Sequence, residues 1–143
     1  MTMHGRTMLL SLVVLVGGVG VARPELAELP LRVAAPAYDA VTQSSVRNLA
    51  MALRSYGLDA GSVDGVTVEE LAGWGWVPQD TTAVTIWVGG EEFRVVAQDV
   101  RPGASAFEYT TVGTDGGPGQ LGLSAARVED PLPGVTIRPL TGS

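Results

Sequence analysis

Few side chains in this sequence could carry acid, base or nucleophilic chemistry. The only histidine is His4 and there is no cysteine, which excludes Ser-His-Asp and Cys-His catalysis and any histidine- or thiolate-bound zinc site. Adjacent side chains point in different directions on a helix or a strand, so acidic doublets make poor acid–base pairs. We interpret the three doublets as solvated surface: Glu69-Glu70, Glu91-Glu92 and Glu129-Asp130. The pattern predicts no enzyme, no catalytic residue and no cofactor.

A metal site is also not predicted. Residues 59–65, DAGSVDG, could offer oxygen ligands to calcium. They lack the alternating acidic positions and the distant glutamate of an EF-hand loop. We therefore interpret this stretch as a plain loop.

Three tryptophans are the candidate ligand or partner face. Residues 73–78, GWGWVP, are predicted to be extended, which would put Trp74 and Trp76 on the same side. Trp87 is predicted to lie opposite Arg94 across a hairpin, at cation–π distance. Such residues could bind a sugar or a peptide, but they more often cover the open edge of a small core.

Composition limits the remaining functions. The formal charge is −6, and the nine basic residues are arginines spread along the chain. Binding to nucleic acid requires a clustered basic face, so we predict no nucleic-acid partner. A length of 143 residues supports a single hydrophobic core without disulfides.

The N-terminus indicates export. His4 and Arg6 precede an apolar run at residues 8–22, which ends at Arg23. As a helix this run would be about 22 Å long, shorter than the roughly 30 Å hydrocarbon core of a bilayer. Residues 1–22 are therefore predicted to be a cleaved signal peptide or a retained membrane anchor. Either outcome makes the protein exported, as a secreted or a membrane-anchored cell-surface chain.

A long amphipathic helix is the element around which the rest is organised. Apolar and small residues recur at three- and four-residue steps between Tyr38 and Leu58, and Gly57 is the predicted stop. The preceding residues 23–36 contain three prolines and are predicted to be a linker. The predicted buried stripe comprises Tyr38, Val41, Ser45, Leu49, Ala52, Leu53 and Tyr56.

The remainder is predicted to be mostly β-structure. Thr67 and Glu70 have capping-box spacing before a short helix that ends near Gly73. Alternation in residues 82–100 predicts a hairpin in which Val84 faces Ala97, Ile86 faces Val95 and Val88 faces Phe93. Strands are also predicted at 107–112 and at 121–128.

The predicted fold class is α+β, with the helix packed on a three- to four-stranded antiparallel sheet. The predicted organisation is a globular domain at 37–128 followed by a Pro-rich tail at 129–143, an edge strand or a loose end. The anchors of the core are expected to be Leu49, Leu53 and Tyr56 against Ile86, Val95 and Tyr109.

The order of these parts resembles a type IV pilin or pseudopilin. The features are the apolar N-terminal segment, the helix opened by Pro36-Ala37-Tyr38 with the run SSVRNLAMALRSY, a Gly-rich loop, the hairpin, and the strand containing Phe107-Glu108-Tyr109. The resemblance implies a non-enzymatic structural subunit of a cell-surface filament or secretion apparatus. Its partners would be further pilin-like subunits and, through residues 8–22, the membrane. The alternative is a free secreted binding module that uses Trp74 and Trp76.

Overall fold

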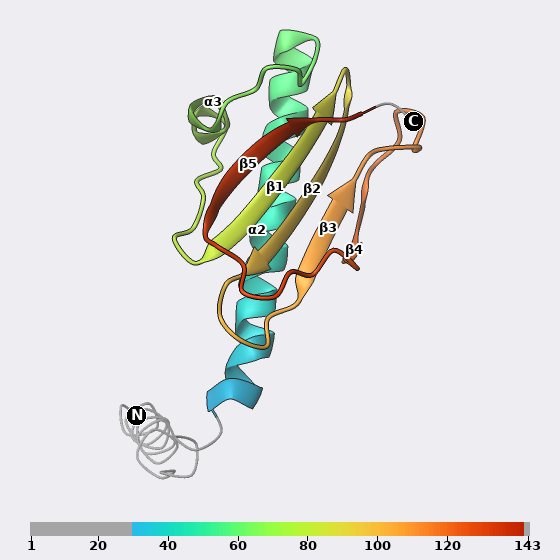
Figure 1. Cartoon of the computed structure of the whole chain (residues 1–143). Helices are drawn as coiled ribbons and strands as arrows, with labels where there is room; N and C mark the ends of the chain where they lie inside the picture. Colours follow the sequence, from blue (N-terminus) through green and yellow to red (C-terminus); the bar gives the residue numbers. More distant parts are fainter. Residues whose placement is uncertain (1–29, 142–143) are drawn as a thin grey trace, which may run out of the picture. The chain divides into compact units, whose positions relative to one another are not determined.

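The structure, a computed structural model, describes residues 30–141 (Figure 1). The elements in this range are α2 (Pro30–Ala60), α3 (Val68–Gly73), β1 (Thr82–Gly89), β2 (Glu92–Asp99), β3 (Ala106–Thr110), β4 (Gln120–Leu123) and β5 (Gly134–Pro139). The packing reported below lies within the compact unit Ala34–Ser143. The predicted signal peptide or anchor, residues 1–22, lies outside the described residues. Within the described range, neither helix is long and apolar enough to cross a membrane.

The prediction of a linker over residues 23–36 is wrong from Pro30 onward, because α2 begins there. Proline suits the first position of a helix, since its φ is already helical and its missing N–H would have no partner in any case. Pro36 lies inside α2 and removes one main-chain hydrogen bond. Tertiary packing further along stabilises the helix more than propensity does, so a single interior proline is tolerated.

Helix α2 also runs past Gly57, the predicted stop, and ends at Ala60. Gly61 has a φ of 82°, a left-handed conformation that favours glycine. The Gly61 N–H donates to the Gly57 carbonyl oxygen at 2.8 Å. Gly61 is therefore the residue that ends α2.

The buried face of α2 differs from the predicted stripe in its first half. Leu49, Ala52 and Leu53 are buried as predicted. Closer to the N-terminus of the helix, however, Thr42 and Val46 are the buried residues and Val41 is exposed. One residue along a helix turns the side chain by about 100°. The observed buried stripe includes Thr42. Because threonine is a polar residue, a search for apolar periodicity does not identify it as buried. Its hydroxyl donates to the carbonyl oxygen of Tyr38 at 2.9 Å, so it is buried without an unpaired group.

The predicted hairpin is confirmed in register. Strands β1 and β2 are antiparallel, with Val84 opposite Ala97, Ile86 opposite Val95 and Val88 opposite Phe93. All six side chains are buried. The capping box of α3 is confirmed as well: the Thr67 N–H donates to the Glu70 carboxylate at 2.8 Å, and the Glu70 N–H donates to the Thr67 hydroxyl at 3.2 Å.

The predicted sheet is too small and of the wrong type. The sheet has five strands in the order β4-β3-β2-β1-β5, and β5 pairs with β1 in parallel, so the sheet is mixed. The predicted Pro-rich tail, residues 129–143, contains β5 and thus contributes an edge strand to the domain. Proline is tolerated at an edge because one side of such a strand has no ladder partner. Val135 and Ile137 of β5 pack against the core.

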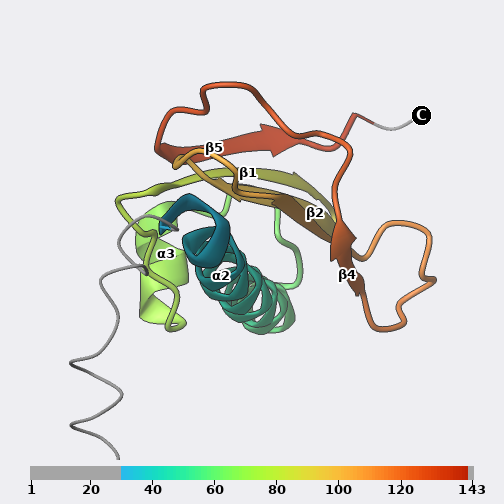
Figure 2. The ribbon, with the colours of Figure 1, turned by 90° about the horizontal axis from the view of Figure 1, so that it is seen from below.

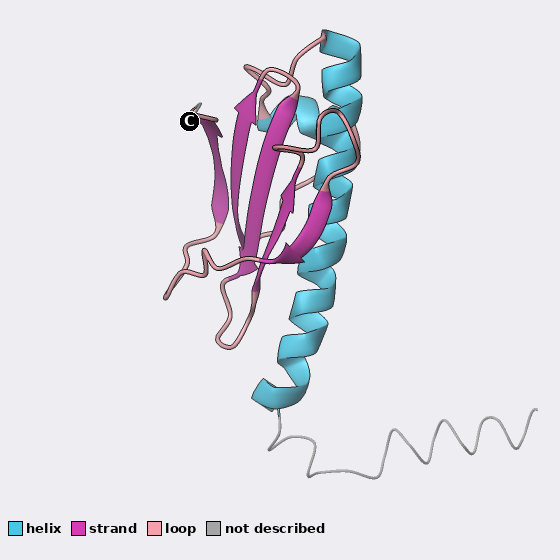
Figure 3. Ribbon diagram, turned by 90° about the vertical axis from the view of Figure 1, so that its right-hand side faces the viewer, coloured by secondary structure: helices cyan, strands magenta, loops and turns pink. Residues whose placement is uncertain are grey.

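One face of the sheet carries the core. Figure 3 shows α2 lying along that face, and Figure 2 shows the chain between β4 and β5 crossing on the opposite face. Leu49 and Leu53 of α2 share the core with Ile86 and Val95, and Tyr56 and Tyr109 pack against its margin. These are the predicted anchors. On the opposite face the Gln98 side chain donates to the Val128 carbonyl oxygen and accepts from the Val128 N–H, each at 3.0 Å. These two hydrogen bonds attach the segment between β4 and β5 to the sheet.

The loop between β2 and β3 holds the first turns of the packed helix. The Ser105 N–H donates to the Asp39 carboxylate at 2.9 Å. The Arg101 guanidinium lies over the Tyr38 ring, 3.5 Å from its centroid, and also pairs with the buried Asp99 carboxylate at 2.6 Å. This ion pair lowers the pKa of Asp99, chiefly through the hydrogen bonds from the Arg101 side chain.

Candidate functional site

The three tryptophans do not form one face. Trp76 is only 2% exposed and belongs to the core, with its Nε1–H donating to the Ser45 hydroxyl at 3.2 Å. Trp74 ends α3 and is 45% exposed. The predicted extended conformation is wrong here because Gly75 has a φ of 97° and the Trp76 N–H donates back to the Leu71 carbonyl oxygen. This turn sends the two side chains to different environments.

Trp87 lies on the other side of the sheet. The register of β1 puts it opposite Arg94, and the Arg94 guanidinium is 4.8 Å from the ring centroid, so the predicted cation–π pair is confirmed. Arg94 also forms an ion pair with Glu108 at 2.8 Å. Trp87 is therefore separated from Trp76 by the thickness of the sheet, and a shared tryptophan platform does not exist.

Because Trp76 is a core residue, we expect Trp76→Phe to lower the stability of the domain by roughly 1–2 kcal/mol, through the lost hydrogen bond to Ser45 and the smaller ring. Urea denaturation followed by circular dichroism measures this change. The matched variant Trp74→Phe should stay within about 0.5 kcal/mol of the parent protein. Equal effects of the two substitutions would contradict the different burial of the two rings.

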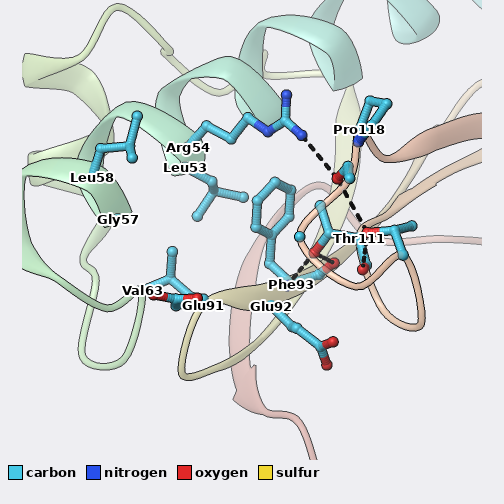
Figure 4. A pocket seen from close by; sticks show the side chains of 13 residues that line it. Leu53, Arg54, Gly57, Leu58, Val63, Glu91, Glu92, Phe93, Thr111 and Pro118 are labelled. Carbon is cyan, nitrogen blue, oxygen red and sulfur yellow. Dashed lines mark hydrogen bonds between the residues drawn. The ribbon is translucent and has the colours of Figure 1, made fainter.

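A groove lies at the C-terminal end of α2 (Figure 4). Its volume is about 620 Å³, within the 300–1,000 Å³ typical of ligand sites. Four segments supply its lining: the last turns of α2, the loop after it, the β1–β2 turn, and the β3–β4 loop. The lining comprises Leu53, Arg54, Gly57, Leu58, Val63, Glu91, Glu92, Phe93, Thr111, Thr114, Gly116, Gly117 and Pro118.

The floor of the groove is apolar and rigid. Leu53, Val63 and Phe93 are fully buried there, and the Phe93 ring stacks on Tyr109 with 5.9 Å between centroids. The Phe93 main chain is fixed by Thr111, whose hydroxyl accepts from the Phe93 N–H at 2.9 Å. A floor held this way needs little reorganisation when something binds above it.

The rim combines acidic side chains with one bridging arginine. Glu91 and Glu92 are exposed at the β1–β2 turn, and neither takes part in the ion pairs found within residues 30–141. Arg54 Nη2 donates to the Gly117 carbonyl oxygen at 3.2 Å, which joins α2 to the β3–β4 loop. The groove therefore presents an apolar floor, the Arg54 guanidinium, and two carboxylates that form no ion pair within residues 30–141.

The turn that carries these carboxylates is itself anchored. The Asp64 carboxylate accepts from the Gly90 N–H at 3.1 Å, and the Ser62 hydroxyl donates to the Gly90 carbonyl oxygen at 2.9 Å. Gly90 has a φ of 62°, which suits glycine. The loop predicted to be plain thus serves to fix the β1–β2 turn.

Among the residues that the structure describes, no three His, Cys, Asp or Glu side chains come close enough to hold a metal ion. Sequence reasoning missed the groove because its lining comes from segments far apart in the chain. The available signal was the doublet Glu91-Glu92 directly before the inward-facing Phe93, and it predicted only a solvated turn.

Comparison of the chain with protein-family profiles, with curated proteins and with solved structures found no match in any of the three. The function therefore has to be argued from the fold and the surfaces described above.

Proposed function

We propose that this chain is a non-enzymatic, pilin-like structural subunit of a cell-surface filament or secretion apparatus. It is exported and held in the membrane through residues 8–22, and its partners are further pilin-like subunits. The observation that carries the proposal is the side of α2 that faces away from the sheet. Met51 is 67% exposed on this side, although Leu49 and Leu53 on the other side are fully buried.

The outward side of α2 has the chemistry of a contact surface. The exposed Arg47 lies one helical turn from Met51, and the helix has no carboxylate between Asp39 and Asp59, in a chain whose formal charge is −6. A solvated helix of an acidic protein would ordinarily carry acidic residues outward. Exposed apolar side chains beside basic ones favour burial against an acidic, partly apolar neighbour.

The proposal does not depend on pilin-type processing. A pilin is cleaved after a glycine and carries a glutamate at the fifth mature position, whereas here Gly5 is followed by Arg6 and Leu10 stands at that position. What supports the proposal is the long helix packed by one side on an antiparallel hairpin, with the other side open.

The test is assembly of the full chain carrying Met51→Asp. A carboxylate at the centre of the outward side would have to be desolvated in the assembled state, so we expect at least a tenfold loss of high-molecular-weight material sheared from the cell surface. Leu132→Asp, an equally polar change at an exposed leucine outside α2, is the control and should assemble normally. Unchanged sedimentation of the Met51→Asp chain would remove the proposed role of α2.

A further inference from the structure

The two edge strands of the sheet, β4 and β5, differ in how they are protected (Figure 1). An edge strand presents unpaired N–H and C=O groups, and proteins usually guard such an edge with charged residues or prolines. Strand β5 contains Arg138 and Pro139 and follows Pro131 and Pro133. Strand β4 contains neither a charged residue nor a proline, and residues 116–126 include no charged side chain. The edge at β4 is therefore the less protected one.

The main-chain groups on the outer edge of β4 belong to Leu121 and Leu123. Strand β4 pairs antiparallel with β3, and the Ser124 N–H donates to the Ala106 carbonyl oxygen at 2.9 Å. Alternate residues of an antiparallel strand bond to the same neighbour. Gly122 therefore bonds toward β3 as Ser124 does, and the two leucines direct their N–H and C=O groups away from it. In the described part of the chain these outward groups have no main-chain partner.

The outer edge of β5 is a poorer template for another strand. The Leu140 N–H donates to the Val88 carbonyl oxygen at 2.7 Å, so alternate residues of β5 bond toward β1. The outward positions are then Val135, Ile137 and Pro139. Because proline has no N–H, this edge lacks one of its donors.

The β4 edge also exposes an apolar side chain. Leu123 lies opposite Phe107 and is 75% exposed, although Phe107 itself is buried. Leu121, on the same face of β4, packs against the core. No atom lies within 4 Å of the position that a Gly122 Cβ would occupy. A strand added outside β4 would thus cover Leu123 and pair the outward main-chain groups at once.

We infer that β4 pairs antiparallel with β4 of a second copy, about a two-fold axis that passes between the two Gly122 residues. In this register Leu121 of each copy lies opposite Leu123 of the other, and each such pair exchanges both of its main-chain hydrogen bonds. Gln120 lies opposite Ser124, which places an amide beside a hydroxyl. The two sheets would become one continuous sheet across the axis.

The edge favours a second copy because it is complementary to itself. Under this two-fold axis residues 118–126 of the two copies face each other, and none of them is charged. Copies of a chain with a formal charge of −6 repel one another in general, so an uncharged stretch is where they can approach. The contact is isologous and closes at a dimer. It goes beyond the proposed function and does not depend on it.

The absence of cysteine allows the contact to be trapped covalently in the full chain. The two Gly122 residues form a non-hydrogen-bonded pair with Cα atoms about 4.5 Å apart, within the range of a disulfide. Cysteine fits there because space is open at the Cβ position. In cells that express the full chain, Gly122→Cys should therefore form a disulfide-linked dimer under mild oxidation.

Leu123→Cys is the matched control for exposure. Residue 123 of one copy is diagonal to residue 123 of the other, with Cα atoms about 7–8 Å apart, too far for a disulfide. We expect at least tenfold more dimer from Gly122→Cys at the same oxidation time, although Leu123 is itself 75% exposed.

Proline at position 123 tests the main-chain pairing. It removes an outward N–H and no hydrogen bond to β3, and proline is tolerated in edge strands. Gly122→Cys/Leu123→Pro should therefore give at least tenfold less dimer than Gly122→Cys. Gly122→Cys/Leu132→Pro makes the same change at an exposed leucine outside the sheet and should keep the dimer. Circular dichroism of each purified variant establishes that it is folded.

The intact mass of the trapped species identifies the occupant, and the expected value is that of two chains. A disulfide to a different protein instead would overturn the second copy as the partner. Equal dimer from Gly122→Cys and Leu123→Cys would overturn the register, and a dimer unaffected by Leu123→Pro would overturn the main-chain pairing. No dimer from Gly122→Cys would overturn the contact altogether. Membrane-bound and soluble chains are both measured, so these results do not depend on the proposed function.

Discussion

Replacing Leu53 by aspartate is expected to abolish cooperative folding of the domain. Leu53 has no exposed surface and lies in the core with Phe93 and Val95. A carboxylate there would be buried without a partner, and the apolar contacts of the leucine would be lost as well. Their combined effect exceeds about 4 kcal/mol, comparable with the whole stability of a small domain, which is roughly 5–15 kcal/mol.

A thermal melt followed by circular dichroism measures this effect. Met51→Asp is the matched control, because it also replaces an apolar side chain by a carboxylate, two residues away on the exposed side of the same helix. The control should melt close to the parent protein. If the Leu53→Asp protein melted as the parent does, the packing of α2 on the sheet would be wrong.

The second large effect is expected at Asp99. Its carboxylate is buried at the end of β2 and accepts hydrogen bonds from the Arg101 N–H at 2.9 Å and from the Arg101 guanidinium at 2.8 and 2.6 Å. Asp99→Ala leaves the Arg101 N–H without its partner and frees the guanidinium that lies over Tyr38. We expect a loss of roughly 2–3 kcal/mol in the free energy of unfolding at neutral pH. Asp99→Asn, which keeps the shape and part of the hydrogen bonding, should lose less.

The same residue makes stability depend on pH in a defined direction. Hydrogen bonding to Arg101 lowers the pKa of Asp99 below its ordinary value of 3.8. The carboxylate therefore contributes stability that is present above pH 3.8 and is lost as the pH falls through the lower pKa of the folded state. Urea denaturation at a series of pH values should show a steeper acid decline for the parent protein than for Asp99→Ala. Parallel curves would contradict the ion pair with Arg101.

The parts of the fold that follow from local patterns could be predicted. The β1–β2 register was predictable because alternation on both strands and the length of the turn at Gly90 lead to the same pairing. The capping box at Thr67 has its own spacing signal. In both cases the partners lie within about fifteen residues of each other in the chain.

Features that depend on distant partners could not be predicted. Proline predicts a helix boundary, but α2 continues through Pro36 and begins at Pro30. The tail was predicted to be an edge strand or a loose end, and the edge-strand alternative is confirmed, but the parallel pairing of Val135 and Ile137 with β1 has no signal in the local sequence. The groove needs α2, the β1–β2 turn and the β3–β4 loop at once, so no single stretch of sequence contains its signal.

Attachment of the chain to the membrane and its assembly through α2 can be tested together. The most direct test is the intact mass of the chain recovered from cell-surface material that is sheared off and sedimented at high speed, compared with the culture supernatant. The account predicts a sedimenting chain that retains residues 8–22. A soluble chain beginning at Arg23 in the supernatant, with none in the sediment, would contradict it and identify the apolar run as a cleaved signal peptide.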